Sequence, residues 1–275
     1  DFFPGAYATY RRLRGETPLR AMVAIRAPSR KARKNKAAGF PHTMAMADSA
    51  LDNPFWSSLR SIHRGLAIGG DEAARYPSDF APFLGVANAD VDADEAVAPL
   101  LASAETVLLL GVLPKLSGAW QLETFRPLAQ MIRDEPLERV DGPDIVALDE
   151  THRADVLALT ALVYPHYFRP RTMELGRYFG IYVPDANGHV RLAAMIGERL
   201  GTDTHVEMSA ICTHPDFTGR GYARRLTAFL TNDTLERGRT PFLHVSYGNP
   251  QAKSLYERMG YRLRRDIPFW ALRRA

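Results

Sequence analysis

A glycine-rich turn between an apolar strand and an amphipathic helix is the segment of this sequence best suited to chemistry. Residues 209–226 read Ser-Ala-Ile-Cys-Thr-His-Pro-Asp-Phe-Thr-Gly-Arg-Gly-Tyr-Ala-Arg-Arg-Leu. Such a turn leaves several backbone N–H groups free at the start of one helix, where the helix dipole adds positive potential. Glycine also lets a ligand approach the backbone closely. The pattern therefore predicts an anion site, and phosphate is the anion that fits it best.

Two other glycine-rich phosphate motifs do not fit this turn. A dinucleotide fingerprint requires Gly-x-Gly-x-x-Gly, and its third glycine position is occupied by Arg224. A P-loop requires Gly-Lys followed by Ser or Thr, which the chain lacks here. The turn is therefore expected to bind a phosphorylated ligand of another class.

The elements around the turn follow a regular order from residue 144 onward. Alternation and helical periodicity predict strands, helices and closing strands in the order β-α-α-β-β-β-α-β-α-β-β. The predicted strands cover residues 145–148, 178–183, 191–200, 205–213, 241–246, 261–265 and 269–272. The predicted helices cover residues 150–163, 172–175, the segment after the glycine turn to about residue 237, and 250–259.

Residues 46–140 are expected to form a smaller α/β unit of unknown role. Helices are predicted at residues 57–67, 92–102 and 121–133, and strands at residues 83–86 and 107–112. Residues 134–143 contain two prolines and one glycine and are the best candidate for a linker. This gives three parts: a basic leader (1–45), the smaller unit (46–140) and the domain carrying the turn (144–275).

The positive charge of the chain is concentrated in the leader. Residues 1–40 hold ten Lys or Arg and two acids, a balance of +8, whereas the whole chain has a net charge of +4. Such runs are usually solvated and disordered, and contact with nucleic acid through this leader is the alternative. Met44 and Met46 precede the first globular patterning, so the native start is expected near them. We expect no other nucleic-acid contact.

Cysteine content and hydropathy indicate a cytoplasmic protein without a membrane anchor. Cys212 is the only cysteine among 275 residues, so no intramolecular disulfide and no thiolate metal cluster can form. The longest apolar run, residues 106–113, is the length of a strand and well short of the roughly 20 residues that span a bilayer. Residues 1–45 contain no continuous apolar stretch typical of a signal peptide.

Three segments, in order, resemble the GNAT-type N-acetyltransferases, with the FR-type subgroup the expected one. The first is Ile-Cys-Thr-His-Pro at 211–215 with Thr-Gly-Arg-Gly-Tyr-Ala at 218–223, and the second is the strand Phe-Leu-His-Val at 242–245. The third, residues 249–261, is similar to the family's Asn-x-x-Ala-x-x-Leu-Tyr-Glu-x-x-Gly-Phe helix. Thr218 departs from the Arg or Gln usual at that position. The resemblance covers residues 144–275 in architecture and implies the GNAT fold, a mixed, mostly antiparallel splayed sheet flanked by helices.

The resemblance also implies acetyl-CoA as the acetyl donor, with no metal. Its pyrophosphate would sit on the turn, and its pantetheine arm would pair with the strand before it as an added strand does. The implied donor-binding residues are Ile211, Cys212, Thr213, Gly219, Arg220, Gly221, Tyr222, Ala223, Arg224 and Asn249. This pairing requires the strand 205–213 to splay from the strand 241–246. Arg220 and Arg224 are equally compatible with a solvated helix face, and an N-cap alone would explain Asn249 before Pro250.

The resemblance further implies a general base, which is needed because an ammonium pKa lies near 10. Glu207 leads because it precedes Thr213 by six residues, in the register of Ser209 and Ile211 if the strand alternates regularly. His244, on the facing strand, is second and Glu198 is third. Glu207 facing solvent and His244 in the core remain open alternatives.

Tyr256 resembles the family's general acid, since a phenol pKa near 10 lies just above that of a thiol; an aromatic that only anchors the helix is its alternative. Cys212 has no arranged base partner and is not expected to be a nucleophile. The acceptor is expected to be a primary amine on a small molecule or peptide, near the aromatic segment 164–171. A non-catalytic acyl-CoA sensor of the same fold is the alternative function, and the sequence does not indicate the oligomeric state.

Overall fold

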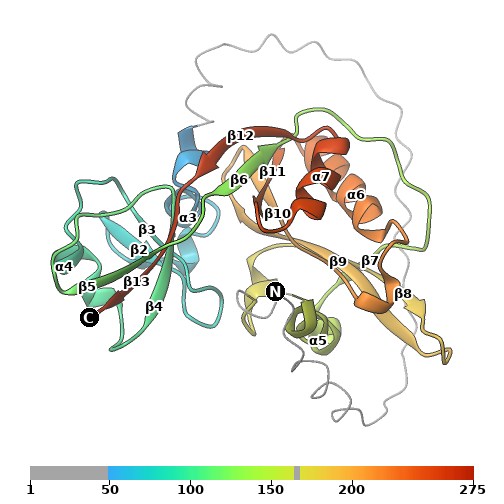
Figure 1. Cartoon of the computed structure of the whole chain (residues 1–275), viewed down its shortest axis with the longest axis horizontal. Helices are drawn as coiled ribbons and strands as arrows, with labels where there is room; N and C mark the ends of the chain where they lie inside the picture. The colour runs from blue at the N-terminus through green and yellow to red at the C-terminus, as the bar shows by residue number, and fades with distance from the viewer. Residues whose placement is uncertain (1–48, 164–167) are drawn as a thin grey trace.

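The computed structural model describes residues 49–163 and 168–275, which form three β-sheets and the helices around them (Figure 1). The predicted leader and residues 164–167 lie outside the described residues. The strands are β1 (Ile68–Gly69), β2 (Ala73–Arg75), β3 (Leu84–Val86), β4 (Thr106–Leu110), β5 (Trp120–Thr124), β6 (Leu128–Ile132), β7 (Val146–Leu148), β8 (Tyr178–Pro184), β9 (Val190–Gly201), β10 (His205–Thr213), β11 (Thr240–Ser246), β12 (Arg262–Ile267) and β13 (Phe269–Arg274). The α-helices are α3 (Pro54–Leu59), α4 (Ala93–Ala96), α5 (Arg153–Val163), α6 (Tyr222–Glu236) and α7 (Pro250–Arg258).

The central sheet has seven strands in the order β12-β6-β11-β10-β9-β8-β7. Every neighbouring pair is antiparallel except β10 and β11, which are parallel. Helices α6 and α7 cover one face of this sheet and α5 lies on the other (Figure 1). The predicted GNAT-type fold class and the predicted element order after residue 144 are both confirmed, with a 3-10 turn at Thr172–Leu175 in place of the short helix.

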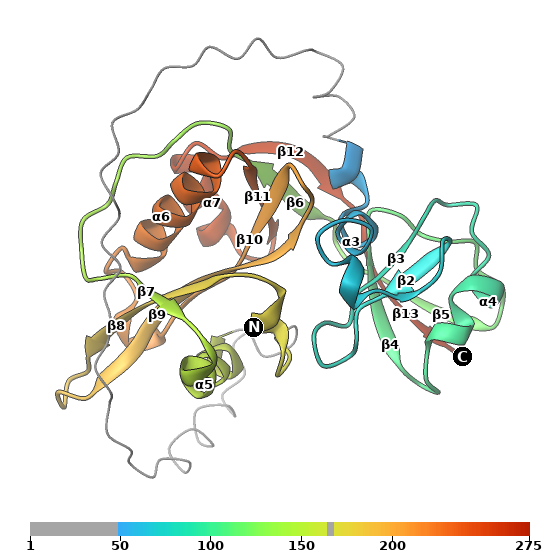
Figure 2. The same cartoon turned by 180° about the vertical axis from the view of Figure 1, so that it is seen from behind.

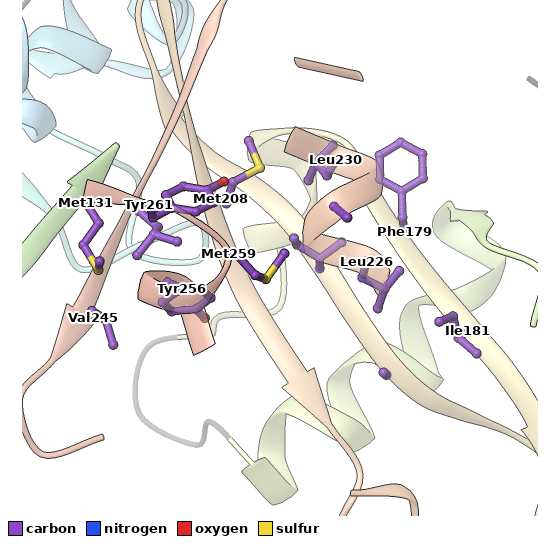
Figure 3. Packing of buried hydrophobic residues seen from close by; sticks show 14 of the residues in the cluster. Met131, Phe179, Ile181, Met208, Leu226, Leu230, Val245, Tyr256, Met259 and Tyr261 are labelled. Atoms are coloured by element: carbon purple, nitrogen blue, oxygen red, sulfur yellow. The ribbon is translucent and has the colours of Figure 1, made fainter. Parts of the chain in front are cut away.

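The main core lies between the central sheet and helices α6 and α7. Leu226 and Leu230 of α6 belong to one buried cluster with Met208 of β10, Val245 of β11 and Met131 of β6 (Figure 3). These residues alternate along their strands, so the pleat directs them to the helical face. No helix in the described part of the chain is long and apolar enough to cross a membrane.

The predicted helix at residues 121–133 is wrong, because this segment forms the two strands β5 and β6. Strand β6 is inserted between β11 and β12, with Met131 opposite both Leu243 and Leu263. Buried residues on both faces of β6 gave an apolar density that local periodicity could not distinguish from a helix. Pairing with strands more than a hundred residues away decides the conformation.

The N-terminal part is richer in strands than predicted. The two predicted strands correspond to β3 and β4, but the predicted helices at 57–67 and 92–102 shorten to α3 and α4 with adjoining 3-10 turns at Arg64–Leu66 and Ala98–Leu100. Two three-stranded sheets, β1-β2-β3 and β4-β13-β5, make up most of this part. Leu84, Leu109 and Leu272 pack together in its core.

Strand pairing crosses the boundary expected at residues 134–143 twice. β6 lies before this boundary and pairs within the central sheet, whereas β13 lies after it and pairs with β4 and β5 (Figure 2). A shared core joins the two parts, with Phe55 and Tyr76 from one packed with Leu200 and Phe242 from the other. Segment 134–143 runs over the outside of α6, where Asn232 bonds both backbone groups of Leu137, at 2.7 and 2.8 Å.

Candidate functional site

The two parallel strands of the central sheet separate at the point where the site is expected. β10 pairs with β11 only through His205, Val206 and Glu207, whose partners are Thr240, Pro241 and Phe242. Beyond that point β10 continues to Thr213 and β11 to Ser246, but the two strands no longer pair with each other. The predicted splay is therefore present, and its apex lies at Glu207.

The glycine turn directly follows the open end of β10. Gly219 and Gly221 have φ values of 75° and 77°, a left-handed conformation that glycine adopts without strain, and a Cβ at either position would meet no atom within 4 Å. Gly221 is the N-cap of α6, and no side chain caps this helix end. After Thr218, Arg225 is the first residue whose N–H group finds a backbone acceptor, the carbonyl of Gly221 at 3.0 Å. The N–H groups of 219–224 thus have the free arrangement that the predicted anion site requires.

The side chains of the turn differ in their surroundings. The Thr218 hydroxyl donates to the carbonyl of Pro215 at 3.0 Å, so this residue stabilises the turn locally. The Arg220 guanidinium lies 5.0 Å from the centre of the Phe217 ring, and Arg224 lines a neighbouring cavity. Tyr222 and Ala223 form the first turn of α6.

A cavity of about 470 Å³ lies between α6, α7 and segment 137–140. Ala228, Leu255 and Met259 contribute apolar surface, and the charged residues of the lining are Arg224, Arg258 and Glu138. Arg224, which lines the cavity, is also the last residue of the 219–224 segment. An apolar cavity with two guanidinium groups suits a ligand that carries both a flat apolar moiety and phosphate.

A β-bulge reverses the expected alternation along β10. Ser209 pairs with Gly197 and Cys212 with Met195, so Ala210 and Ile211 together oppose a single residue of β9. Ala210 has φ 50°, which is rare for a residue with a Cβ. Ile211 consequently packs on the α6 and α7 side, and the prediction that it shares a face with Glu207 is wrong.

The strand residues beyond the bulge are otherwise placed as expected. Cys212 is buried in the cluster that includes α5, and burial raises the pKa of its thiol to about 12, which removes its nucleophilic form at neutral pH. Thr213 ends β10 at the open side of the splay. The backbone of residues 211–213 thus borders the gap.

Helix α7 begins at the open end of β11 and holds two further predicted site residues, Asn249 at its N-cap and Tyr256 within the helix. Asn249 caps it, since its Oδ1 accepts from the N–H of Ala252 at 3.1 Å and Pro250 occupies the first position. Tyr256 is buried in the α6 and α7 cluster, where Figure 3 shows it with Met259 and Tyr261. Its ring centre lies 6.1 Å from that of Tyr261.

Glu207 and His244 are brought together on the other face, at the apex of the splay. His244 Nδ1 lies 2.7 Å from Glu207 Oε1, and both side chains are only 1% exposed. Arg199, on β9, donates to both carboxylate oxygens, with its Nε 2.9 Å from Oε2 and its Nη2 2.7 Å from Oε1. Burial alone would raise the pKa of Glu207, but the charge of Arg199 and the hydrogen bonds from His244 and Arg199 outweigh it and lower this pKa to about 2.

The second ring nitrogen of His244 faces Gln130, a fully buried residue of β6. Gln130 Nε2 lies 3.0 Å from His244 Nε2 and donates to the carbonyl of Leu51 at 2.8 Å. The predictions missed Gln130 and Arg199, because each is a polar residue in a strand whose partner is distant in sequence. Their one signal is that they interrupt apolar strand patterns without a local partner.

Glu198, the third candidate base, lies away from this cluster. Its carboxylate is bound by Arg177, which also donates to Asp233 of α6 at 2.6 Å. This pairing directs Glu198 to the helical side of the sheet, away from Glu207. Within the described residues, no group of three or more His, Cys, Asp and Glu side chains is arranged to hold a metal ion.

Comparison with known proteins identifies relatives of this architecture. A family model described as FR47-like protein matches residues 185–270. A GNAT-family structure from Novosphingobium aromaticivorans is 32% identical, with a TM-score of 0.71 over 82% of this chain and 98% of that one. A GCN5-related N-acetyltransferase from Kribbella flavida, 16% identical, shares the fold with a TM-score of 0.53 over 86% of this chain and 96% of that one. No curated protein matches the sequence.

Proposed function

Because the chain belongs to the GNAT family of acetyltransferases, we propose that it transfers an acetyl group from acetyl-CoA to a primary amine by direct attack on the thioester. One observation carries this proposal: the free N–H groups of 219–224 adjoin the gap that opens where β10 and β11 stop pairing. An anion cradle next to unpaired strand backbone suits a ligand with a pyrophosphate and a long amide-containing arm. Both parts are present in coenzyme A.

The donor would be held mainly by backbone. The pyrophosphate would accept from the N–H groups of 219–224, and the amides of the pantetheine arm would pair with residues 211–213. Asn249, whose Nδ2 group is not needed for the helix cap, would donate to the arm from the opposite side. The adenosine end, with its 3′-phosphate, would fill the cavity lined by Arg224 and Arg258.

The bulge in β10 would supply the oxyanion site. Where two residues oppose one, a peptide N–H is left outside the ladder of β9 and β10. Because β10 no longer pairs with β11 at this point, we expect that N–H to face the gap. A fixed N–H at this place would stabilise the negative charge that develops on the carbonyl oxygen during attack. Because the strand backbone holds this N–H group in place, the group reorganises little as the charge forms.

The protons would move through the residues on either face of the gap. The amine would lose a proton to His244 Nε2, which would exchange its hydrogen bond from Gln130 for the proton of the amine, while the amine nitrogen bonds to the carbonyl carbon and the carbon–sulfur bond breaks. The low pKa of Glu207 makes it a poor proton acceptor, but its permanent negative charge stabilises the imidazolium that forms on His244. Tyr256 would donate its phenolic proton to the leaving thiolate.

Acetyl-CoA-dependent thiol release, measured across a panel of small-molecule and peptide amines, tests the proposal. Turnover with at least one amine, with mass spectrometry showing the acetyl group on its nitrogen, is the expected result. Tight binding of acetyl-CoA without turnover for any amine would instead identify an acyl-CoA sensor. His244→Asn should lower kcat at neutral pH by about 100-fold and leave acetyl-CoA binding intact.

A further inference from the structure

Gln130 occupies a position from which it can control the ionisation of His244. It is fully buried on β6, the strand that the N-terminal part inserts next to β11, and it lies directly opposite His244 in the strand register. Its side-chain amide has three partners: His244 Nε2 at 3.0 Å, the carbonyl of Leu51 at 2.8 Å and Arg264 Nη1 at 2.8 Å. Each hydrogen-bonding atom of the Gln130 side-chain amide therefore has at least one partner.

These partners determine which way the amide points. The Leu51 carbonyl only accepts and the Arg264 guanidinium only donates, so Nε2 must face Leu51 and Oε1 must face Arg264. The second hydrogen on Nε2 is then directed at His244 Nε2. A flipped amide would place two acceptors together at Leu51 and two donors together at Arg264.

The orientation of Gln130 in turn determines the state of the imidazole. His244 Nε2 must accept, and Nδ1 must carry the hydrogen that it donates to Glu207. A proton on Nε2 would face the Gln130 N–H group, a repulsive contact in a buried site. We propose that Gln130 is a positioning residue, which keeps His244 neutral with Nε2 unprotonated in the resting enzyme; this deepens, and rests on, the proposed function.

The same contacts connect the base to the start of the described chain. Leu51 and Asp52 form a 3-10 turn, and Asp52 Oδ1 lies 2.7 Å from Nη1 of both Arg264 and Arg265. The turn therefore holds Gln130 directly through Leu51 and indirectly through Arg264. The titratable and charged groups around the ring, counted over all elements packed there, are Glu207, Arg199, Tyr76, Arg264 and Asp52. This N-terminal turn beside the base gives the N-terminal part of the described chain a role in positioning the base.

Gln130→Glu is the decisive variant, because it keeps the shape and the Arg264 contact but replaces the group that donates to both His244 and the Leu51 carbonyl by a carboxylate oxygen. His244 Nε2 should then bind a proton, and the acidic limb of the kcat profile should move to higher pH by about one unit or more. At neutral pH, kcat should fall about tenfold while the KM for acetyl-CoA stays within about twofold. Gln121→Glu is the matched control, since Gln121 is an exposed glutamine on β5 that accepts from Arg273 at 2.8 Å.

The nitrogen NMR shifts of the His244 ring give a readout that does not depend on turnover. The ring is assigned by comparison with His244→Asn, and the wild-type protein should show a protonated Nδ1 and an unprotonated Nε2 at neutral pH. Gln130→Glu should convert Nε2 to the protonated form, and Gln121→Glu should leave both shifts unchanged. A protonated Nε2 in the wild type, or unchanged shifts in a folded Gln130→Glu protein, would overturn the proposal. Absence of turnover with every amine would instead overturn the proposed function and leave the shifts to decide on Gln130.

Discussion

Substituting Glu207 by Gln should destabilise the protein strongly at neutral pH. The carboxylate is fully buried and accepts from His244 Nδ1, Arg199 Nε and Arg199 Nη2 at 2.7 to 2.9 Å. Glutamine preserves the volume but removes the charge and presents an amide N–H to donors. Arg199, only 13% exposed, would keep its positive charge but lose this carboxylate.

Two independent routes give the same magnitude. The pKa of Glu207 falls from 4.5 to about 2 in the folded protein, which corresponds to about 3 kcal/mol of folding free energy at pH 7. Removing one partner of a buried ion pair costs roughly 3–5 kcal/mol in other proteins. Because the folded pKa is the lower one, this stabilisation is complete above pH 4.5 and is lost as the pH falls toward 2.

Urea unfolding followed by circular dichroism, from pH 7 to pH 3, measures both the size and the pH dependence. Glu207→Gln should cost about 3 kcal/mol at pH 7, and the difference from wild type should shrink to less than half by pH 3. Glu123→Gln, on an exposed position of β5, is the control and should change stability by less than about 0.5 kcal/mol. A cost below about 1 kcal/mol at pH 7, or a difference that stays constant with pH, would refute the ion-pair reasoning.

Four further predictions concern the donor side of the site and the strand that borders it. Tyr256→Phe should lower kcat at least tenfold with acetyl-CoA affinity, measured calorimetrically, unchanged; an unaltered kcat would exclude Tyr256 as the acid. Gly221→Ala should weaken acetyl-CoA binding and lower the free energy of unfolding by about 1 kcal/mol, since φ 77° strains alanine although its Cβ meets no atom. The reverse change, Ala210→Gly, should relieve φ 50° and raise the melting temperature. Wild type should bind CoA more tightly than dephospho-CoA, and Arg258→Ala should remove most of that difference; equal discrimination in both proteins would contradict the assigned cavity.

Local sequence patterns were sufficient to predict the elements that would hold acetyl-CoA. The strand, glycine turn and helix at residues 205–236 form from neighbouring residues, and Asn249 with Pro250 marks the start of α7 through capping alone. Such features are readable because each depends on residues within one or two turns. The splay, in contrast, was expected only from the family resemblance, because parallel neighbouring strands normally stay paired.

Features that depend on distant partners could not be read in the same way. The bulge at Ala210 has no sequence signal, since the residue is a small alanine that tolerates φ 50° only because β9 pairs on both sides of it. The partners of Glu207 come from β9 and β11, and Gln130 reaches His244 across a strand inserted from 114 residues earlier. Burial of that cluster likewise depends on the packing of Phe83, 5.1 Å from the Arg199 guanidinium, which no periodicity predicts.

The exchange of β6 and β13 between the two parts also constrains how the chain can fold during synthesis. β6 leaves the ribosome long before β11 and β12, the strands between which it must lie. The sheet of β4 and β5 cannot form until β13, which lies between them, has been synthesised. A nascent chain that has not yet reached β12 and β13 therefore presents open edges on β4, β5 and β6 together. The two parts must complete each other in one late step, so stalled or truncated chains should depend on chaperones and aggregate without them.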